Sequence, residues 1–272
     1  MPGDIVIDFY TKDIAHEWKR LVQDAYHRLE FETTLHYLRK YLPASGTILD
    51  AGGGPGRYTV TLARQGYQMV LMDLTPANLE FAERKIRDLR LKRKVKQLVE
   101  GSLVDMSFFP DNSFDAVICL GGPLSHILDP IDRQTAAAEL VRVARPGAPI
   151  FVSVIARLAL LITELVYFPH EIELPHFSQI RDNGNYEGGY GFTACHFFLP
   201  EEIPALFKGL PITQSELIGL EGLSSNQRTA LNRLARQPVR WEKWIETHYL
   251  TCSHPAVVGM SEHMLYIGQK CP

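Results

Sequence analysis

The chain has 272 residues, of which 46% are hydrophobic and 22% are charged, as in ordinary soluble globular proteins. Its formal net charge is −3 at pH 7, so no overall positive field would attract nucleic acid. This length accommodates one large domain or a domain with insertions. The composition therefore argues against a nucleic-acid partner.

The cellular location is predicted from three features. The four cysteines form no C-x-x-C pair and have no histidine at metal-ligand spacing, which favours reduced thiols and no metal site. The N-terminal segment lacks the basic and apolar regions of a signal peptide. The most apolar stretch, residues 150–162, is interrupted by Arg157 and is too short to span a bilayer. We therefore expect a cytoplasmic protein without a membrane partner.

The N-terminal part of the chain is predicted to be a helical cap over residues 1–43. Apolar residues recur at near-helical spacing across residues 14–42, and Pro43 ends the segment. Tyr10 precedes these helices and has no strand or helix pattern of its own. We therefore expect the Tyr10 ring to be available to a ligand.

Residues 44–272 predict an α/β domain with a Rossmann-like sheet. Strands are expected at residues 47–51, 68–73, 95–99, 114–120, 149–155, 212–220 and 264–268. Helices are expected at residues 57–65, 76–91, 132–144 and 200–208. Alternation of this kind is typical of a mostly parallel sheet with helices on both faces.

Two insertions interrupt this alternation. Residues 157–192 lack regular periodicity and contain a glycine-rich segment at residues 188–191, so we expect a lid over the carboxyl edge of the sheet. Residues 224–250 predict a second, helical insertion that is broken at Pro238.

The most informative motif follows the first strand of the α/β domain. That strand ends at Asp50, and a turn with Gly52, Gly54 and Gly56 then opens a helix. Glycine lets the backbone turn tightly and approach a ligand, and the helix N-terminus offers unpaired N–H groups. The next strand ends in Asp73, where a carboxylate can accept hydrogen bonds from both hydroxyls of a ribose. The pattern predicts a nucleoside-binding site.

The spacing of the glycines distinguishes between two kinds of nucleoside cofactor. A dinucleotide site would read G-x-G-x-x-G, but Arg57 stands at its third glycine. The pattern D-x-G-x-G-x-G from Asp50 to Gly56 instead resembles the first motif of class I S-adenosylmethionine-dependent methyltransferases. The element order resembles that family's core over residues 44–156 and 194–270, and its small-molecule members include ubiquinone- and menaquinone-biosynthesis methyltransferases. The resemblance implies a seven-stranded sheet with an antiparallel last strand, and S-adenosyl-L-methionine as cofactor.

The resemblance also implies a cofactor site along the carboxyl ends of the strands. Its expected members are Tyr10, Asp50, Ala51, Gly52, Gly53, Gly54, Gly56, Asp73, Leu74, Ser102, Leu103, Leu120 and Gly121. Asp73 would hold the ribose, and Leu74 would pack against the adenine. Related proteins often have Gly-Asp-Ala where this chain has Gly101-Ser102-Leu103, so Ser102 would replace an aspartate as the hydrogen-bond acceptor.

His126 is the candidate catalytic residue. It lies in the loop after the fourth strand, where class I enzymes commonly place groups that face the acceptor. If the acceptor is a hydroxyl, the imidazole can take its proton near neutral pH. Two other interpretations stay open: His126 caps a helix, or catalysis rests on positioning alone. His170, His176 and His196 lie in or border the first insertion and are further candidates, and for His196 the alternative is a core histidine bonded to the backbone.

The predicted function is methyl transfer from S-adenosylmethionine to an O, N or C atom of a small-molecule acceptor, by a monomer or homodimer. The motif Asn/Asp-Pro-Pro-Tyr, typical of enzymes that methylate nucleic-acid bases, is absent, and Leu120-Gly-Gly-Pro123 stands in its place. One alternative is a non-catalytic module that binds S-adenosylmethionine. The other is an NAD(P)-dependent oxidoreductase, although the missing third glycine argues against it.

Overall fold

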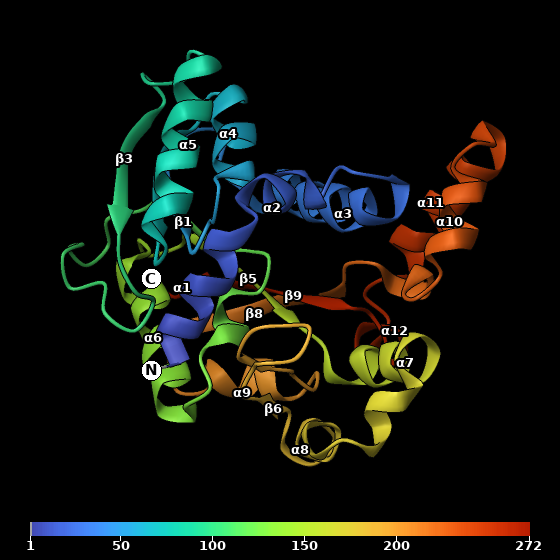
Figure 1. Ribbon diagram of the computed structural model, residues 1–272. Helices are drawn as coiled ribbons and strands as arrows, with labels where there is room; N and C mark the ends of the chain where they lie inside the picture. Colours follow the sequence, from blue (N-terminus) through green and yellow to red (C-terminus); the bar gives the residue numbers. More distant parts are fainter. Residues whose placement is uncertain (1) are drawn as a thin grey trace.

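The computed structural model describes residues 2–272, so Met1, the first residue of the predicted cap, lies outside the described residues. A central seven-stranded sheet has the order β3-β2-β1-β4-β5-β9-β8 (Figure 1). Its strands are β1 (Thr47–Ala51), β2 (Gln68–Asp73), β3 (Val95–Glu100), β4 (Ala116–Cys119), β5 (Pro149–Ile155), β8 (Ile212–Gly219) and β9 (His263–Lys270). The first five strands pair in parallel, and β9 runs antiparallel between β5 and β8. The predicted fold class is confirmed, including the antiparallel last strand.

Helices cover both faces of this sheet. They include α3 (Ala25–Tyr41), α4 (Arg57–Arg64), α5 (Pro76–Asp88), α6 (Pro130–Val143), α9 (Glu202–Leu206) and α12 (Pro255–Val258). Neighbouring residues of a strand point to opposite faces. In β1, Ile48 accordingly belongs to an apolar cluster with Leu38 of α3 and Leu62 of α4. Leu49 belongs to a second cluster with Leu140 of α6. Both faces of the sheet therefore form hydrophobic core.

The N-terminal helices differ from the prediction in two ways. The expected helical segment 14–42 is divided into α2 (Ile14–Arg20) and α3, because the Asp24 side chain caps α3 by accepting a hydrogen bond from the His27 amide. Tyr10, for which no helix was expected, lies in α1 (Pro2–Lys12). Its neighbour Phe9 packs edge-on against Phe192, a contact with a residue far away in the sequence.

The two predicted insertions contain regular elements. Residues 157–192 form α7 (Arg157–Tyr167), the 3-10 helix η2 (Pro169–Glu173), α8 (Pro175–Asn183) and the short strand β6 (Asn185–Tyr186), which pairs with β7 (Cys195–His196). The second insertion contains α10 (Arg228–Leu234) and α11 (Pro238–Thr251), so the expected break at Pro238 is present. Two further 3-10 helices are η1 (Pro123–His126) and η3 (Gly222–Ser224). In Figure 1, α7 and α8 lie opposite α2 and α3 across the carboxyl edge of the sheet.

Most observed boundaries agree with the predicted ones to within three residues. The strands β1, β2 and β5 begin and end at the expected residues, whereas β4 is shorter than residues 114–120 and α9 is shorter than residues 200–208. Within residues 2–272, no helix combines the length and the apolar character that crossing a membrane requires.

Candidate functional site

The glycine-rich loop after β1 has a backbone that other residues would strain. Gly52, Gly54 and Gly56 have φ angles of +74°, +56° and +82°, a region that favours glycine. A Cβ on Gly53 would lie 2.5 Å from Asp50 Cγ, so this position has no room for a side chain. At Gly54 the nearest atom to such a Cβ is 3.9 Å away, which means that this residue faces open space.

The Asp50 carboxylate holds the loop to the helix that follows it. It accepts hydrogen bonds from the Thr59 amide at 3.1 Å and the Thr59 hydroxyl at 2.6 Å. Burial raises the pKa of Asp50 to about 7, because the charged carboxylate has lost its contact with water. Asp50 thus points toward α4, away from the space in front of the loop.

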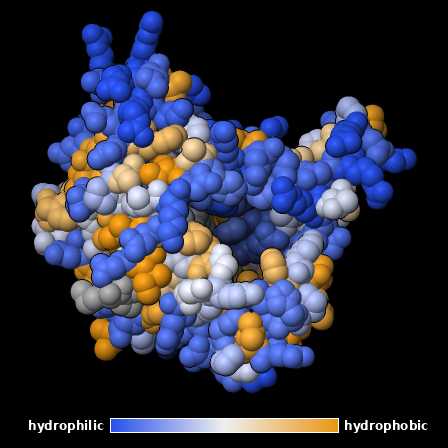
Figure 2. All heavy atoms as spheres, viewed as in Figure 1, coloured by the Kyte–Doolittle hydropathy of each residue, from blue (hydrophilic) through white to orange (hydrophobic). Residues whose placement is uncertain are grey.

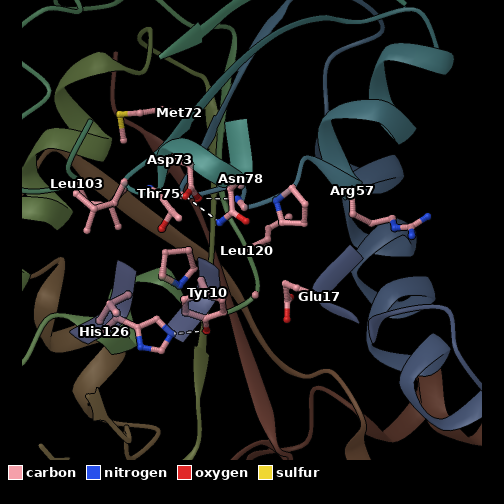
Figure 3. Close-up of a pocket in the computed structure, with 18 of the residues that line it drawn as sticks. Tyr10, Glu17, Arg57, Met72, Asp73, Thr75, Asn78, Leu103, Leu120 and His126 are labelled. Carbon is pink, nitrogen blue, oxygen red and sulfur yellow. Dashed lines mark hydrogen bonds between the residues drawn. The ribbon is translucent and has the colours of Figure 1, made fainter. Parts of the chain in front are cut away.

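Asp73, at the end of β2, organises the other side of the loop. Its carboxylate accepts hydrogen bonds from the Gly54 amide at 2.7 Å, the Thr75 amide at 2.9 Å and the Asn78 side chain at 3.1 Å (Figure 3). Burial raises the pKa of Asp73, while these three donors lower it. The result is a buried acceptor group at the carboxyl end of β2.

A cavity of about 150 Å³, here called the first cavity, opens in front of this loop. It lies where the strand order reverses between β1 and β4, the position at which open α/β sheets bind ligands. The predicted site residues that line it are Tyr10, Gly52, Gly53, Gly54, Asp73, Leu74, Ser102, Leu103, Leu120, Gly121 and His126. Three other predicted residues, Asp50, Ala51 and Gly56, do not line it, because they lie behind the loop at its attachment to the core.

Several lining residues were missed by the sequence analysis. Thr75 and Asn78 follow Asp73 at the start of α5, and a cap pattern of Thr, Pro and Asn directly after an acidic strand end was a usable signal. Glu17 and Arg20 come from α2. Their sequence carries no such signal, since only the packing of the cap onto the sheet brings α2 to this cavity.

A second, larger cavity of about 440 Å³ adjoins the first. Both cavities are lined by Tyr10, Glu17, Arg20 and Gly121, so they share a wall. Residues of α3, α7 and α8 contribute to the rest of the second cavity, together with residues of α1, β5, β9 and the loops beside them. Figure 2 shows a recess near the centre of this face, between the N-terminal helices and the first insertion, with hydrophilic residues in its depth.

Tyr10 and His126 form a hydrogen-bonded pair at the shared wall. The His126 Nδ1 lies 2.9 Å from the Ala194 carbonyl, which can only accept, so Nδ1 carries the proton. Nε2 lies 2.8 Å from the Tyr10 hydroxyl and therefore accepts from it (Figure 3). Burial lowers the pKa of His126, which keeps the ring neutral in this arrangement. Both ring nitrogens of His126 are thus engaged in hydrogen bonds within the protein.

The other candidate histidines have different surroundings. His196 is buried and bonds to Asn185 at 2.6 Å, as expected for a histidine of the core. His170 is exposed, with 65% of its side chain accessible. His176 lines the second cavity, where its Nε2 lies 3.1 Å from the Glu171 carboxylate.

Comparison with known proteins connects this geometry to a family. Residues 48–147 match the family model described as a methyltransferase domain. The chain is 29% identical over 140 residues to a glycine/sarcosine N-methyltransferase of Parasynechococcus marenigrum (strain WH8102), which is 50% of this chain and 47% of that protein. It is 33% identical over 124 residues to a ubiquinone biosynthesis O-methyltransferase of Xylella fastidiosa (strain 9a5c), 45% of this chain and 48% of that protein. The chain spans about half the length of the curated relatives it matches.

A solved structure shows the same fold over most of the chain. The SAM-dependent methyltransferase from Methanosarcina mazei superposes with a TM-score of 0.60 at 20% identity, covering 86% of this chain and 97% of that chain. Residues 48–147 thus match a methyltransferase domain, and the fold over most of the chain is that of the class I S-adenosylmethionine-dependent methyltransferases. S-adenosyl-L-methionine is the cofactor of this class. The matched residues of the methyltransferase domain include the glycine-rich loop, Asp73 and the loop that carries His126.

A buried ionic cluster forms part of the second cavity. His263 Nδ1 lies 2.8 Å from a Glu221 oxygen and 3.8 Å from a Glu30 oxygen. Donor atoms of these three residues all lie within 4.8 Å of one another, a spacing at which a metal ion could bind, although the sequence predicted no metal site. The neighbouring carboxylates raise the pKa of His263 to about 9 despite its burial, so near neutral pH the imidazolium itself balances their charge.

The His263 cluster makes the stability of the protein depend on pH. The folded-state pKa of about 9 lies above the usual value of 6.5, so the stabilisation is complete below pH 6.5 and is lost as the pH rises through 9. Each unit of difference between the folded-state and unfolded-state pKa corresponds to about 1.4 kcal/mol, so the free energy of unfolding should fall by about 3 kcal/mol. Urea unfolding at pH 6.5 and 9.5 should show this decrease in the wild type and a much smaller one in His263→Gln. Equal decreases in the two proteins would contradict it.

Proposed function

We propose that the protein transfers a methyl group from S-adenosylmethionine to a small molecule held in the second cavity. The observation that supports this is the pair of adjoining cavities at the carboxyl edge of the sheet, with one wall in common. The first is lined by the motif that the family uses for its cofactor. The second is the larger of the two and is enclosed by the segments in which class I members differ.

The first cavity offers a matching group for each part of the cofactor. The buried Asp73 carboxylate is proposed to accept from the ribose hydroxyls, and Leu74 with Leu103 to contact the adenine. The amino-acid part of the cofactor would then extend toward the shared wall. Arg20, which already pairs with Glu17 and Glu30, is the cation available there for its carboxylate.

The reaction needs little from the protein beyond positioning. A lone pair on the acceptor forms a bond to the methyl carbon as the carbon–sulfur bond breaks, and that bond's electrons neutralise the sulfonium. An acceptor that carried a proton releases it in the same process. Holding the reacting atoms in line near contact distance can supply most of the rate enhancement. The shared wall is where such an alignment can occur.

His126 and Tyr10 are proposed to act at the acceptor side of this wall. An acceptor hydroxyl that displaces the Tyr10 hydroxyl from Nε2 would meet a neutral imidazole able to take its proton. The Nδ1–H bond to the Ala194 carbonyl would hold the ring in place during this exchange. Because burial lowers the pKa of His126, the base form persists below pH 6.5.

We also propose that residues 1–43 form a cap on a methyltransferase domain of residues 44–272. The cap is fastened to the domain by the Arg57 side chain, which stacks on the Trp18 ring at 3.8 Å and donates to the Trp18 carbonyl. A dinucleotide site would have its third glycine at the position of Arg57. Because Arg57 instead uses its side chain to hold the cap, this position weighs against the oxidoreductase alternative.

The cofactor assignment is tested with two glycine variants. Gly54 and Gly147 both have positive φ angles, +56° and +80°, and at neither would a Cβ meet an atom within 3.8 Å. Gly54→Ala and Gly147→Ala should therefore carry a similar strain of roughly 1–2 kcal/mol. Only Gly54→Ala places a methyl group in the first cavity, so it should weaken S-adenosylhomocysteine binding at least tenfold in calorimetric titration. Equal affinities, or thermal stabilisation of the wild type by NAD instead, would contradict the assignment.

The role of His126 is tested with His126→Asn. Asparagine can donate to the Ala194 carbonyl and accept from Tyr10, but it cannot take a proton. Transfer of labelled methyl groups from S-adenosylmethionine into a metabolite extract should slow by roughly 10²–10⁴. Affinity for S-adenosylhomocysteine should stay within twofold of the wild type. Unchanged turnover would leave His126 as a residue that only positions Tyr10.

The first insertion is proposed to act as a lid over the second cavity. Its residues Leu160, Glu164, Ile180 and Tyr186 line that cavity, so an acceptor must pass this segment. Amides of α7 and α8 should exchange their hydrogens more slowly when S-adenosylhomocysteine is bound, because ordering a lid raises its local stability. Mass-spectrometric hydrogen exchange measures this, with β8, which lines neither cavity, as the unaffected reference. The same exchange rates with and without ligand would make the insertion a fixed wall.

A further inference from the structure

The second cavity is unusually rich in carboxylates. Its lining includes Glu17, Glu30, Glu164, Glu171, Glu221 and Glu262. Against these six, the described lining residues contain one arginine, Arg20, and the protonated His263, and no lysine. A cavity with this excess of negative charge attracts cations and disfavours anionic ligands.

Four of these carboxylates already have partners within the protein. Glu17 pairs with Arg20, and Glu221 pairs with His263. Glu171 contacts His176, and Glu262 accepts from the Tyr26 hydroxyl. The other two, Glu30 and Glu164, each have one carboxylate oxygen without a hydrogen-bond partner.

Glu30 has one oxygen in use and one without a partner. Its side chain is 3% exposed, and Oε2 accepts from Arg20 at 2.8 Å. Oε1 is buried and has no hydrogen-bond partner. Buried polar atoms are nearly always hydrogen-bonded, and leaving one unsatisfied costs stability. Glu30 therefore presents a buried acceptor atom that lacks a donor.

Glu164 shows the same feature in a different element. It comes from α7 and is 7% exposed, and its Oε2 is buried without a hydrogen-bond partner. Burial raises the pKa of Glu164, and the nearby charge of Glu171 raises it further. The residues that line this cavity thus include two carboxylates with an unsatisfied oxygen, Glu30 of α3 and Glu164 of α7.

We propose that the second cavity recognises an acceptor with a protonated amine, whose N–H groups supply the donors that Glu30 and Glu164 lack. This specifies the acceptor class and rests on the proposed function. The rest of the lining fits an apolar body on such an amine, because Phe9, Tyr186 and Phe192 also line the cavity. Aromatic faces attract cations as well as apolar groups.

An amine explains these observations better than a metal ion does. The cluster with metal-ligand spacing uses Glu30, Glu221 and His263, but the His263 ring is already balanced by Glu221. Arg20 also places a fixed positive charge on Glu30. A metal at this cluster would leave Glu164 unsatisfied, since Glu164 is not among its ligands.

The proposal is tested with three ligands of similar shape and different charge. Phenethylamine, 2-phenylethanol and 3-phenylpropanoate share an aromatic body and differ in the terminal group. In calorimetric titration of the S-adenosylhomocysteine-saturated protein, phenethylamine should bind at least tenfold more tightly than the other two. Similar affinity for all three, or no detectable binding of any of them, would overturn the proposal.

Variants separate the two carboxylates from general charge effects. Glu164→Gln and Glu30→Gln should each reduce the preference for phenethylamine at least fivefold, while Glu246→Gln, at an exposed position of α11, should leave it unchanged. Glu164→Gln removes no bond at Oε2, so its fold is expected to be intact, as circular dichroism would verify. A preference retained in both cavity variants would overturn the proposal.

The same titrations without S-adenosylhomocysteine distinguish this inference from the proposed function. An amine preference that depends on Glu164, in a protein that does not bind S-adenosylhomocysteine, would support the acidic cavity and contradict the methyltransferase assignment. Tight S-adenosylhomocysteine binding without an amine preference would support the assignment and contradict the amine.

Discussion

The hydrogen bond between the Gly54 amide and the Asp73 carboxylate is the contact on which the site depends most. It joins the loop after β1 to the end of β2, and thereby defines the front of the first cavity. Asp73 is buried, so its charge is held by the three donors that surround it. A carboxylate has more acceptor positions than these donors occupy, which leaves capacity for a ligand hydroxyl. The Asp73 carboxylate, which orients the loop, is therefore also the group proposed to bind the ribose.

A second constraint is that the cap completes both cavities. Tyr10, Glu17 and Arg20 belong to α1 and α2, yet they line the space beyond the sheet. Three contacts hold these helices in place: Arg57 with Trp18, Arg20 with Glu30, and Tyr10 with His126. Each contact joins residues of different elements. The shape of the site therefore depends on the docking of helices that the sheet itself does not require.

The charges of the second cavity follow from the same arrangement. Elements from four parts of the chain bring carboxylates to one recess, and the protein supplies too few cations to match them. Glu221 has a partner in His263, and this contact raises the pKa of the imidazole to about 9, so that the ring stays protonated at neutral pH. At Glu30, whose other oxygen accepts from Arg20, and at Glu164, one oxygen has no hydrogen-bond partner. An unsatisfied buried oxygen costs stability unless a donor reaches it, and these two atoms are the reason for regarding this cavity as a binding site.

The sequence by itself determined the sheet, the glycine-rich loop and the position of Asp73, because these depend on local patterns. Apolar runs bounded by turns located β1, β2 and β5, and only glycine suits the φ angles at Gly52 and Gly54. Tertiary structure alone decided that Tyr10 belongs to a helix, that Asp50 points toward α4, and that Glu17 and Arg20 reach the cavities. It also decided the state of His126, whose proton lies on Nδ1 because Ala194 is beside it. Contacts between residues so far apart leave no periodic trace in the chain, since they arise only when separate elements pack together.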